Sequence, residues 1–308
     1  MWDNRMSNGS PETVRTAVKS GGASLLLMAA LVLCCPDCRR RKEQPMTESD
    51  DLLNIRPLRR RLKEGKEALG MWLGITDPLA VEAIAADCDL DWVLLDMEHG
   101  GAGWDDLKMV MLGWKWSDVP LFIRPPSHDQ KFLMAALDLG VSGFVVPFVN
   151  SPEDARRVAE ACRYPPKGIR GSAPRRVSRH YTRTEEYKAS ADDDVFVMVQ
   201  IEHRNAVECV EEIADVPGID ALFIGPGDLS YSYGLPFQFD HPTNVAAVQK
   251  VVDTGRAKGL PVAMAVDSTP EEVLQRIEQG IQLVTVGLDW MFMRNAIKEQ
   301  TAAVRALV

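Results

Sequence analysis

Eight short apolar runs recur between residue 68 and the end of the chain, and stretches with the composition of amphipathic helices separate them. The runs are rich in Val, Ile, Leu and Phe with little polar alternation, which is typical of strands buried on both faces of a parallel sheet. They occupy residues 68–74, 92–96, 121–124, 143–149, 195–202, 221–225, 262–266 and 283–287. Eight strand–helix units in about 240 residues are what a (β/α)8 TIM barrel requires, so we predict this α/β fold.

Helix signals between the runs support the same prediction. Ser151 and Thr269 each stand before a proline and two acidic residues, which is the pattern of a helix start. Glycines lie where three predicted helices end, at Gly140, Gly259 and Gly280. A doubly wound sheet is the alternative fold, but the eightfold count and the lack of a G-x-G-x-x-G motif after the first run favour the barrel.

The N-terminal region differs in composition from the rest. Residues 1–67 carry 13 basic and nine acidic side chains, whereas residues 68–308 carry 22 and 35. An apolar run at 25–35 precedes four basic residues at 39–42. The run is shorter than the roughly 20 residues that span a bilayer, and no good cleavage site for a signal peptide follows it. We predict a disordered or targeting extension at 1–50 and the barrel at 51–308, with membrane association unfavoured.

Net charge and cysteine content narrow the class of protein. The formal net charge of −9 argues against a nucleic-acid binder, because such proteins carry a positive surface. Six scattered cysteines are too few for a disulfide framework and favour a reducing compartment. We therefore expect a cytoplasmic location, although the apolar N-terminal run leaves membrane or secretory targeting open.

Polar residues gather where the predicted strands end. In a (β/α)8 barrel the functional site lies at the carboxyl ends of the strands. Carboxylates, an imidazole, a guanidinium and an amide follow the runs, within residues 96–101, 124–126, 200–202, 225–228, 267–268 and 287–289. Because a buried polar group is costly unless it is paired, these groups are expected to hold one another or a ligand.

Two of these carboxylates, Glu202 and Asp228, come from neighbouring strands, which lie about 4.8 Å apart. Carboxylates this close repel unless a proton or a cation lies between them. A pair of oxygen ligands with positions left for water and substrate suits Mg²⁺ or Mn²⁺. The alternative is that Glu202 pairs with an arginine, such as Arg170, and that no metal binds.

The same residues exclude other barrel chemistries. A Schiff-base aldolase needs a lysine at a strand end, and the lysines of this region all fall in predicted helices or loops. The segments after the last two runs lack the glycines of a phosphate-binding site. Of the barrel chemistries considered, metal-assisted chemistry on an anionic, unphosphorylated substrate is the one that remains.

Five ordered motifs make the chain similar to the HpcH/HpaI aldolases, the metal-dependent class II pyruvate aldolases. They are LLDMEHG at 94–100, RPP at 124–126, YPPKGIRG at 164–171, VQIE at 199–202 and FIGPGDLS at 223–230. The resemblance spans about residues 57–300. It implies a barrel of the phosphoenolpyruvate/pyruvate type, a homohexamer that exchanges its last helix, and reversible aldol cleavage of a 4-hydroxy-2-keto acid to pyruvate and an aldehyde.

The resemblance also implies roles for individual residues. Glu202 and Asp228 match the two ligands of the divalent metal, which would be Mg²⁺ or Mn²⁺, with Co²⁺ possible. Arg124 matches the arginine that holds the keto oxygen and the developing enolate, and His99 matches a histidine of the acid/base machinery. Asp96 or the neighbouring Glu98 would orient His99 or Arg124.

Three positions are matched to substrate binding. The backbone amides of Gly227 and Asp228 match those that receive the pyruvate carboxylate, and Gln200 matches a glutamine near metal and substrate.

Within this family, decarboxylation of oxaloacetate by an enzyme like macrophomate synthase is an alternative activity, and a coenzyme A-ester lyase is an alternative within the superfamily. A basic run, Arg175, Arg176 and Arg179, is either a solvated surface or, in a loop near the mouth, an attractor for a dianionic substrate.

Overall fold

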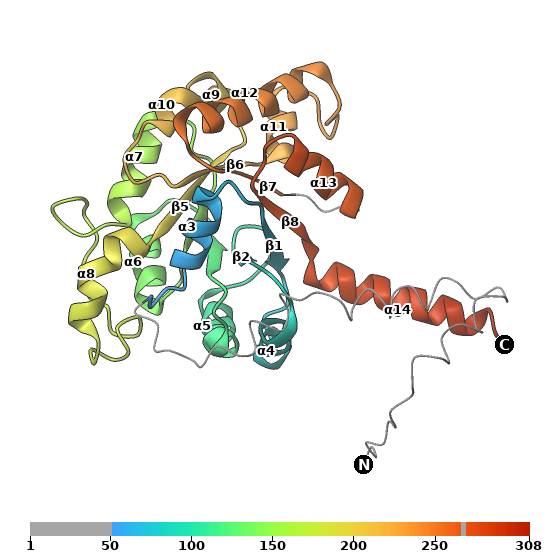
Figure 1. Ribbon diagram of the computed structural model, residues 1–308, viewed down its shortest axis with the longest axis horizontal. Helices are drawn as coiled ribbons and strands as arrows, with labels where there is room; N and C mark the ends of the chain where they lie inside the picture. The colour runs from blue at the N-terminus through green and yellow to red at the C-terminus, as the bar shows by residue number, and fades with distance from the viewer. Residues whose placement is uncertain (1–50, 266–268) are drawn as a thin grey trace, which may run out of the picture. The chain divides into compact units, whose positions relative to one another are not determined.

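The computed structural model describes residues 51–265 and 269–308, and in this part of the chain eight parallel strands close into a barrel (Figure 1). Each strand pairs with its neighbours in sequence, and β8 pairs with β1. The strands are β1 Ala68–Leu73, β2 Trp92–Asp96, β3 Leu121–Arg124, β4 Gly143–Val146, β5 Phe196–Ile201, β6 Ala221–Ile224, β7 Val262–Met264 and β8 Leu283–Leu288. The predicted fold is confirmed.

The observed strands follow the apolar runs closely. β2 and β3 have the predicted bounds, and most of the others end one to three residues earlier because the last apolar residues already belong to the loops. The predicted end of the seventh run, with Asp267 and Ser268, lies outside the described residues, as does the predicted extension at 1–50.

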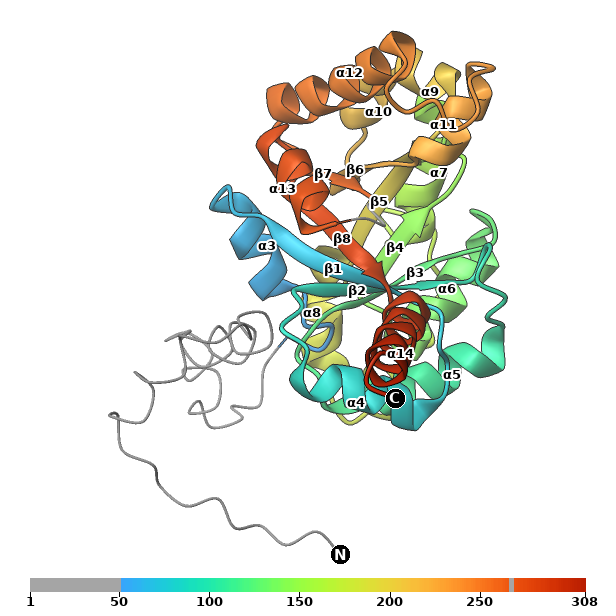
Figure 2. The ribbon, with the colours of Figure 1, turned by 90° about the vertical axis from the view of Figure 1, so that its right-hand side faces the viewer.

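Helices surround the strands (Figure 2). They are α3 Arg56–Lys63, α4 Pro78–Asp87, α5 Trp104–Gly113, η3 Trp114–Trp116, α6 Gln130–Leu139, α7 Pro152–Ala161, α8 Thr184–Asp194, α9 Arg204–Glu208, α10 Val210–Ala214, α11 Pro226–Ser232, α12 Pro242–Lys258, α13 Pro270–Glu278 and α14 Asp289–Arg305. The predicted caps are present, since the side chains of Ser151 and Thr269 accept backbone N–H bonds at the starts of α7 and α13. Gly140 and Gly259 end α6 and α12 in the left-handed conformation.

Two apolar cores hold the barrel together. The larger lies between the strands and the surrounding helices. The smaller fills the barrel interior with large side chains, including Trp72, Trp92, Phe122, Phe196 and Phe223, which meet edge to face. The interior is therefore packed solid, and chemistry is left to the rim.

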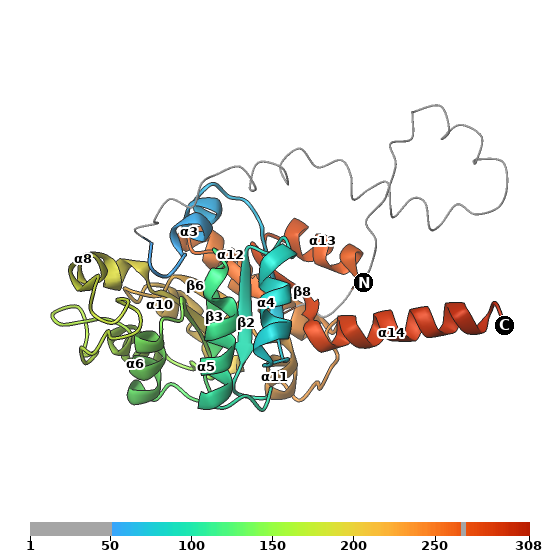
Figure 3. The ribbon, with the colours of Figure 1, turned by 90° about the horizontal axis from the view of Figure 1, so that it is seen from below.

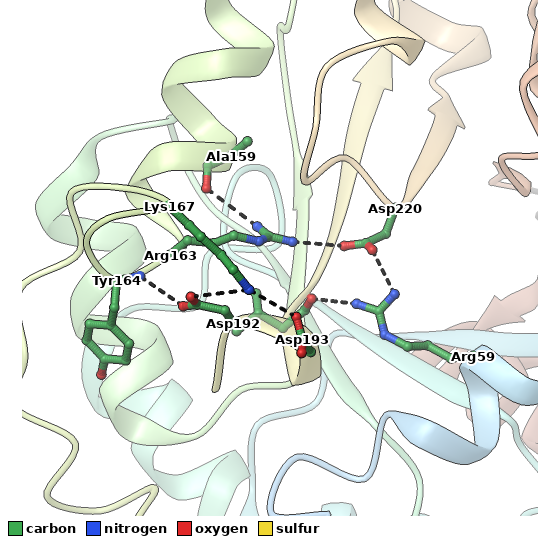
Figure 4. Close-up of polar contacts among 9 residues, drawn as sticks. Arg59, Ala159, Arg163, Tyr164, Lys167, Asp192, Asp193 and Asp220 are labelled. Atoms are coloured by element: carbon green, nitrogen blue, oxygen red, sulfur yellow. Dashed lines mark hydrogen bonds and ion pairs between the residues drawn. The ribbon is translucent and has the colours of Figure 1, made fainter. Parts of the chain in front are cut away.

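Helix α3 closes the amino end of the barrel. Its Leu58 and Leu62 pack into the interior core, and its Arg59 donates to the Val195 carbonyl just before β5. Asp220, which precedes β6, accepts from both Arg59 and Arg163 (Figure 4). These ion pairs fix α3 at the end of the barrel opposite α11 (Figure 3).

Helix α14 runs away from the barrel wall (Figures 1 and 3), and only its first residue, Asp289, is buried. Its large apolar side chains are exposed, among them Phe292, Met293 and Ile297. Of the helices in the described ranges, none combines the length and apolar character needed to cross a membrane.

Candidate active site

The structure brings the polar groups that follow β2, β3, β5 and β6 to one mouth, where they affect one another electrostatically. Glu202 follows β5, and the charges of Asp228, Glu98 and Arg124 all act on its carboxyl group. The parallel register explains this meeting, because carboxyl ends of neighbouring strands lie at the same rim. Glu202, Asp228, Glu98 and Arg124 therefore belong to one site.

Asp96 and Arg124 form the best-defined contact of the site. Arg124 donates from Nε and Nη2 to the two carboxylate oxygens of Asp96, at 2.9 and 2.8 Å. Burial by itself would raise the pKa of Asp96, but hydrogen bonds and charge from Arg124 outweigh it and the pKa lies below its usual value. Asp96 is thus an anion that orients the guanidinium, as the sequence analysis allowed.

Trp72 of β1 also holds this guanidinium. The Cζ atom of Arg124 lies 4.6 Å from the centre of the Trp72 ring, a cation–π contact. The Trp72 ring is itself held edge to face by Phe223 at 6.2 Å. Sequence reasoning missed Trp72 because it reads as one more apolar residue of the first run; the available signal was its position two residues before the end of that run.

Glu98 lies between Arg124 and His99. Its Oε2 is 3.2 Å from Arg124 Nε and 3.8 Å from His99 Nε2. Burial first, and then the charges of Asp96 and Asp228, raise the pKa of Glu98 above its usual value. His99 is largely exposed at the rim, and its backbone N–H donates to Asp96. The imidazole is therefore accessible to a substrate, with a carboxyl group beside it.

Glu202 is only 1% exposed, and its two oxygens are held separately. Oε1 accepts the backbone N–H of Phe148 at 2.6 Å, and Oε2 accepts from Nε2 of Gln200. Burial raises the pKa of Glu202 to about 7, and the charges of Asp228 and Glu98 add to the effect. Within residues 51–265 and 269–308, Glu202 forms no ion pair with a basic side chain within 4 Å, although the charge of Arg124 acts on it.

Phe148 was not found by sequence reasoning. It follows β4 with a positive φ of 52°, a conformation that side chains rarely adopt. That turn aims its N–H at Glu202. Since the contact is made by the backbone, no residue type marks it in the sequence.

Gly225 and Gly227 lie between β6 and Asp228. A Cβ atom at Gly225 would meet the Glu202 and Gln200 side chains at 2.8 and 2.7 Å, so this glycine permits their close approach. A Cβ atom at Gly227 would meet nothing within 4 Å, so no contact requires glycine there. Asp228, in the first turn of α11, is exposed at the mouth.

These residues fit a divalent cation that prefers oxygen ligands. Within residues 51–265 and 269–308 there is no group of three or more His, Cys, Asp or Glu side chains arranged to hold a metal. The chain therefore offers a carboxylate pair, Glu202 and Asp228, and leaves other positions to water or substrate. That donor set suits Mg²⁺ or Mn²⁺.

One alternative offered by the sequence, the pairing of Glu202 with Arg170, is wrong. Arg170 does not pair with Glu202: its Nη2 contacts Asp138 of α6 at 2.8 Å, and its guanidinium packs on the ring of Tyr164. Asp96 and Glu98, either of which the sequence analysis expected to orient Arg124, both contact its guanidinium.

Of the two interpretations of the basic run, the solvated surface fits Arg175 and Arg179, whereas neither describes Arg176. Arg176 donates to the carbonyls of Leu139 and Met111, near the C-terminal ends of α6 and α5 and away from the mouth of its own barrel. It therefore caps helix ends. Arg175 and Arg179 are exposed.

Asp289 joins two strands at the rim. Its carboxylate accepts the backbone N–H groups of Gly74 and Ile75, after β1, and of Trp290 in its own helix. The sequence predicts Asp289 at the mouth but gives it no role. In the structure its hydrogen bonds hold the start of α14 against the end of β1.

Comparison with known proteins gives consistent matches. Residues 68–296 match the model of the HpcH/HpaI aldolase/citrate lyase family. A pyruvate aldolase of Rhizobium etli is 34% identical over 239 residues, 77% of this chain and 92% of that protein. The 2-keto-3-deoxy-L-rhamnonate aldolase of Escherichia coli K12 is 35% identical over 257 residues, 80% and 92% of the two chains.

Solved structures agree with these relatives. A family protein from Burkholderia cenocepacia superimposes with a TM-score of 0.76 and 30% identity, covering 81% of this chain and 99% of that one. The family match at residues 68–296 spans all eight strands of the barrel.

Proposed function

We propose that this chain, which belongs to the HpcH/HpaI aldolase/citrate lyase family, reversibly cleaves a 4-hydroxy-2-keto acid into pyruvate and an aldehyde. The family and its aldolase relatives make the chain a carbon–carbon lyase. The observation that carries this proposal is the buried Glu202, which faces the charges of Asp228 and Glu98 while Asp96 holds Arg124 at the same mouth. Such a site can bind a cation and an anionic substrate together.

Glu202 and Asp228 would hold the metal, Mg²⁺ or Mn²⁺ with Co²⁺ as a further candidate. When bound, a divalent cation supplies Lewis acidity that stabilises negative charge on a keto oxygen. The two ligands differ, since Glu202 is fixed by Phe148 and Gln200 and Asp228 is exposed at the mouth. Glu202 would act as the fixed ligand.

Arg124 would bind the keto oxygen of the substrate. Cleavage of the C3–C4 bond leaves its electron pair as an enolate, and the negative charge develops on this oxygen. Because Asp96, Glu98 and Trp72 already orient the guanidinium, little reorganisation is needed when charge appears. The backbone amides of Gly227 and Asp228 would receive the carboxylate, and Gln200 would lie beside metal and substrate.

His99 would move the proton of the 4-hydroxyl group. Removal of this proton lets the C–O bond become the carbonyl of the aldehyde product while the C3–C4 bond breaks. The exposed imidazole can reach substrate directly or through one water molecule, and Glu98 lies beside it. In a final step C3 of the enolate takes up a proton in place of the one that left the 4-hydroxyl group, from His99 or from water, and pyruvate leaves.

A screen of aldehydes with pyruvate and Mg²⁺ or Mn²⁺ tests this proposal, run with and without EDTA. Hydroxyaldehydes are the first compounds to try, because 2-keto-3-deoxy sugar-acid aldolases are among the relatives. An oxaloacetate arm measures decarboxylation, which forms the same enolate. Turnover that EDTA abolishes supports the proposal; turnover that survives EDTA contradicts the metal role of Glu202 and Asp228.

We also propose that the chain forms a homo-oligomer, a hexamer, by exchange of α14. The exposed Phe292, Met293 and Ile297 give this helix an apolar surface that a second copy can bury. Analytical ultracentrifugation of Ile297→Glu and of the charge-matched control Ala302→Glu, on the opposite side of α14, separates the outcomes. Loss of the oligomer in the first variant alone supports exchange, and monomeric wild-type protein contradicts it.

A further inference from the structure

The outer surface of α3 carries a strongly basic cavity at the amino end of the barrel, opposite the candidate active site. The cavity has a volume of about 350 Å³ and is lined by Arg56, Arg59, Arg60, Lys63 and Glu64. Four of its five lining side chains are cations. This end of a barrel is expected to serve stability, so an open basic cavity there calls for a separate explanation.

Two of the arginines have a structural role. Arg56 forms a double hydrogen bond with Asp194, at 3.1 Å for each bond. Arg59 contacts Asp220 at 2.7 Å and the Val195 carbonyl at 2.7 Å. These contacts hold one wall of the cavity in place and account for the fixing of α3 to the strands.

The other two cations have no such role. Within residues 51–265 and 269–308, neither Arg60 nor Lys63 forms a side-chain hydrogen bond or an ion pair within 4 Å. They stand three residues apart, on the same side of the helix. Glu64, the only acid in the lining, is engaged by Lys66 at 2.6 Å. The cavity therefore has a net positive charge with two cations available to a ligand.

The charge of α3 contrasts with the barrel that carries it. The helix has five basic residues among eight and no acid, whereas residues 68–308 carry 22 basic and 35 acidic side chains. Packing needs only Leu58 and Leu62 to face inward. Arg60 and Lys63 lie in the last turn, where a cation interacts favourably with the helix dipole. Arg61 in the same turn already supplies such a cation, so the dipole does not require all three.

We propose that this cavity binds a small anion with two or more phosphate groups. Guanidinium groups match phosphate oxygens in a two-pronged geometry, and an ammonium group adds a point charge. The volume lies at the small end of the range for ligand pockets, about 300–1,000 Å³, and exceeds what one orthophosphate fills. This ligand is chemically different from the unphosphorylated keto acid of the mouth.

Isothermal titration calorimetry of the full chain with inorganic pyrophosphate tests the proposal, with EDTA present so that no metal site competes. We expect one site per chain whose affinity falls as salt rises. The variant Arg60→Glu/Lys63→Glu should lose at least about tenfold in affinity while keeping its aldolase turnover. The matched control is Arg175→Glu/Arg179→Glu, which makes the same change in charge on another exposed surface.

A nucleoside diphosphate in a parallel titration distinguishes the source of the phosphate groups. Tighter binding than pyrophosphate indicates an organic phosphate, and equal binding indicates that the phosphates alone are recognised. No measurable binding of pyrophosphate overturns the proposal. Equal loss of affinity in the control variant also overturns it, because the binding is then general charge attraction.

Discussion

Asp96 and Arg124 are register partners at the carboxyl ends of β2 and β3, and their side chains meet in two hydrogen bonds of 2.8 and 2.9 Å. The guanidinium of Arg124 also contacts Glu98 and the ring of Trp72. A group with this many contacts cannot swing away from the mouth at low cost. Its orientation is therefore set before substrate binds.

Replacing Arg124 by lysine tests whether orientation or charge alone matters. Arg124→Lys keeps the charge but loses the two-pronged contact with Asp96 and most of the stacking on Trp72. We expect kcat for pyruvate formation to fall by about 100- to 1,000-fold, with a smaller change in KM. Steady-state kinetics measure both, and Arg157→Lys on the exposed surface of α7 is the control. A kcat close to wild type would mean that the oriented guanidinium is not used.

Glu202 is expected to be indispensable for metal binding. Glu202→Gln keeps the size of the side chain but removes the buried negative charge, so we expect Mn²⁺ affinity to drop by at least about 100-fold. Electron paramagnetic resonance of free Mn²⁺ measures this affinity. Glu211→Gln on the exposed side of α10 should bind as wild type does. Undiminished Mn²⁺ binding by Glu202→Gln would place the metal elsewhere.

Arg170 is expected to matter for stability and not for metal binding. Arg170→Met removes a fully buried guanidinium and leaves Asp138 without its partner, which costs about 3–5 kcal/mol in the free energy of unfolding. Urea unfolding measures the cost, with Arg157→Met as the exposed control. The affinity for Mn²⁺ should stay at the wild-type value. A reduced affinity in a folded Arg170→Met protein would revive the pairing of Arg170 with Glu202.

The Asp96–Arg124 pair predicts a particular dependence of stability on pH. Burial opposes ionisation of Asp96, but hydrogen bonds and charge from Arg124 prevail and keep its pKa low in the folded protein. A lowered carboxyl pKa stabilises the fold above the unfolded-state pKa of about 4, and this contribution is lost as pH falls through the folded-state pKa.

The variant Asp96→Asn makes this dependence measurable. The difference in unfolding free energy between wild type and Asp96→Asn should be steady near neutral pH and should shrink below about pH 4. Urea unfolding at a series of pH values gives the difference directly. If the difference in unfolding free energy between the two proteins grows as pH falls, the prediction for the Asp96–Arg124 pair is contradicted.

Much of the fold and several site residues could be predicted because they depend on residue type and spacing. The apolar runs at 92–96 and 121–124 coincide with β2 and β3, and they bring Asp96 and Arg124 together as register partners. Glu202 and Asp228 follow neighbouring strands, and the charge of Asp228 acts on the carboxyl group of Glu202.

The parts that could not be predicted depend on backbone direction or on distant packing. The N–H of Phe148 reaches Glu202 through a left-handed turn that no residue type announces. Trp72 supports Arg124 from a strand distant in sequence. The ion-pair partner of Arg170 could not be predicted because a long basic side chain can reach several carboxylates. The path of the loop brings it to Asp138 and not to Glu202.

Anomalous diffraction from a crystal soaked in Mn²⁺ tests the account most directly. We predict one strong peak at the mouth, with carboxylate oxygens of both Glu202 and Asp228 within about 2.3 Å of it, and no such peak in a Glu202→Gln crystal treated in the same way. A wild-type crystal with no peak between these two carboxylates would contradict the proposed metal centre.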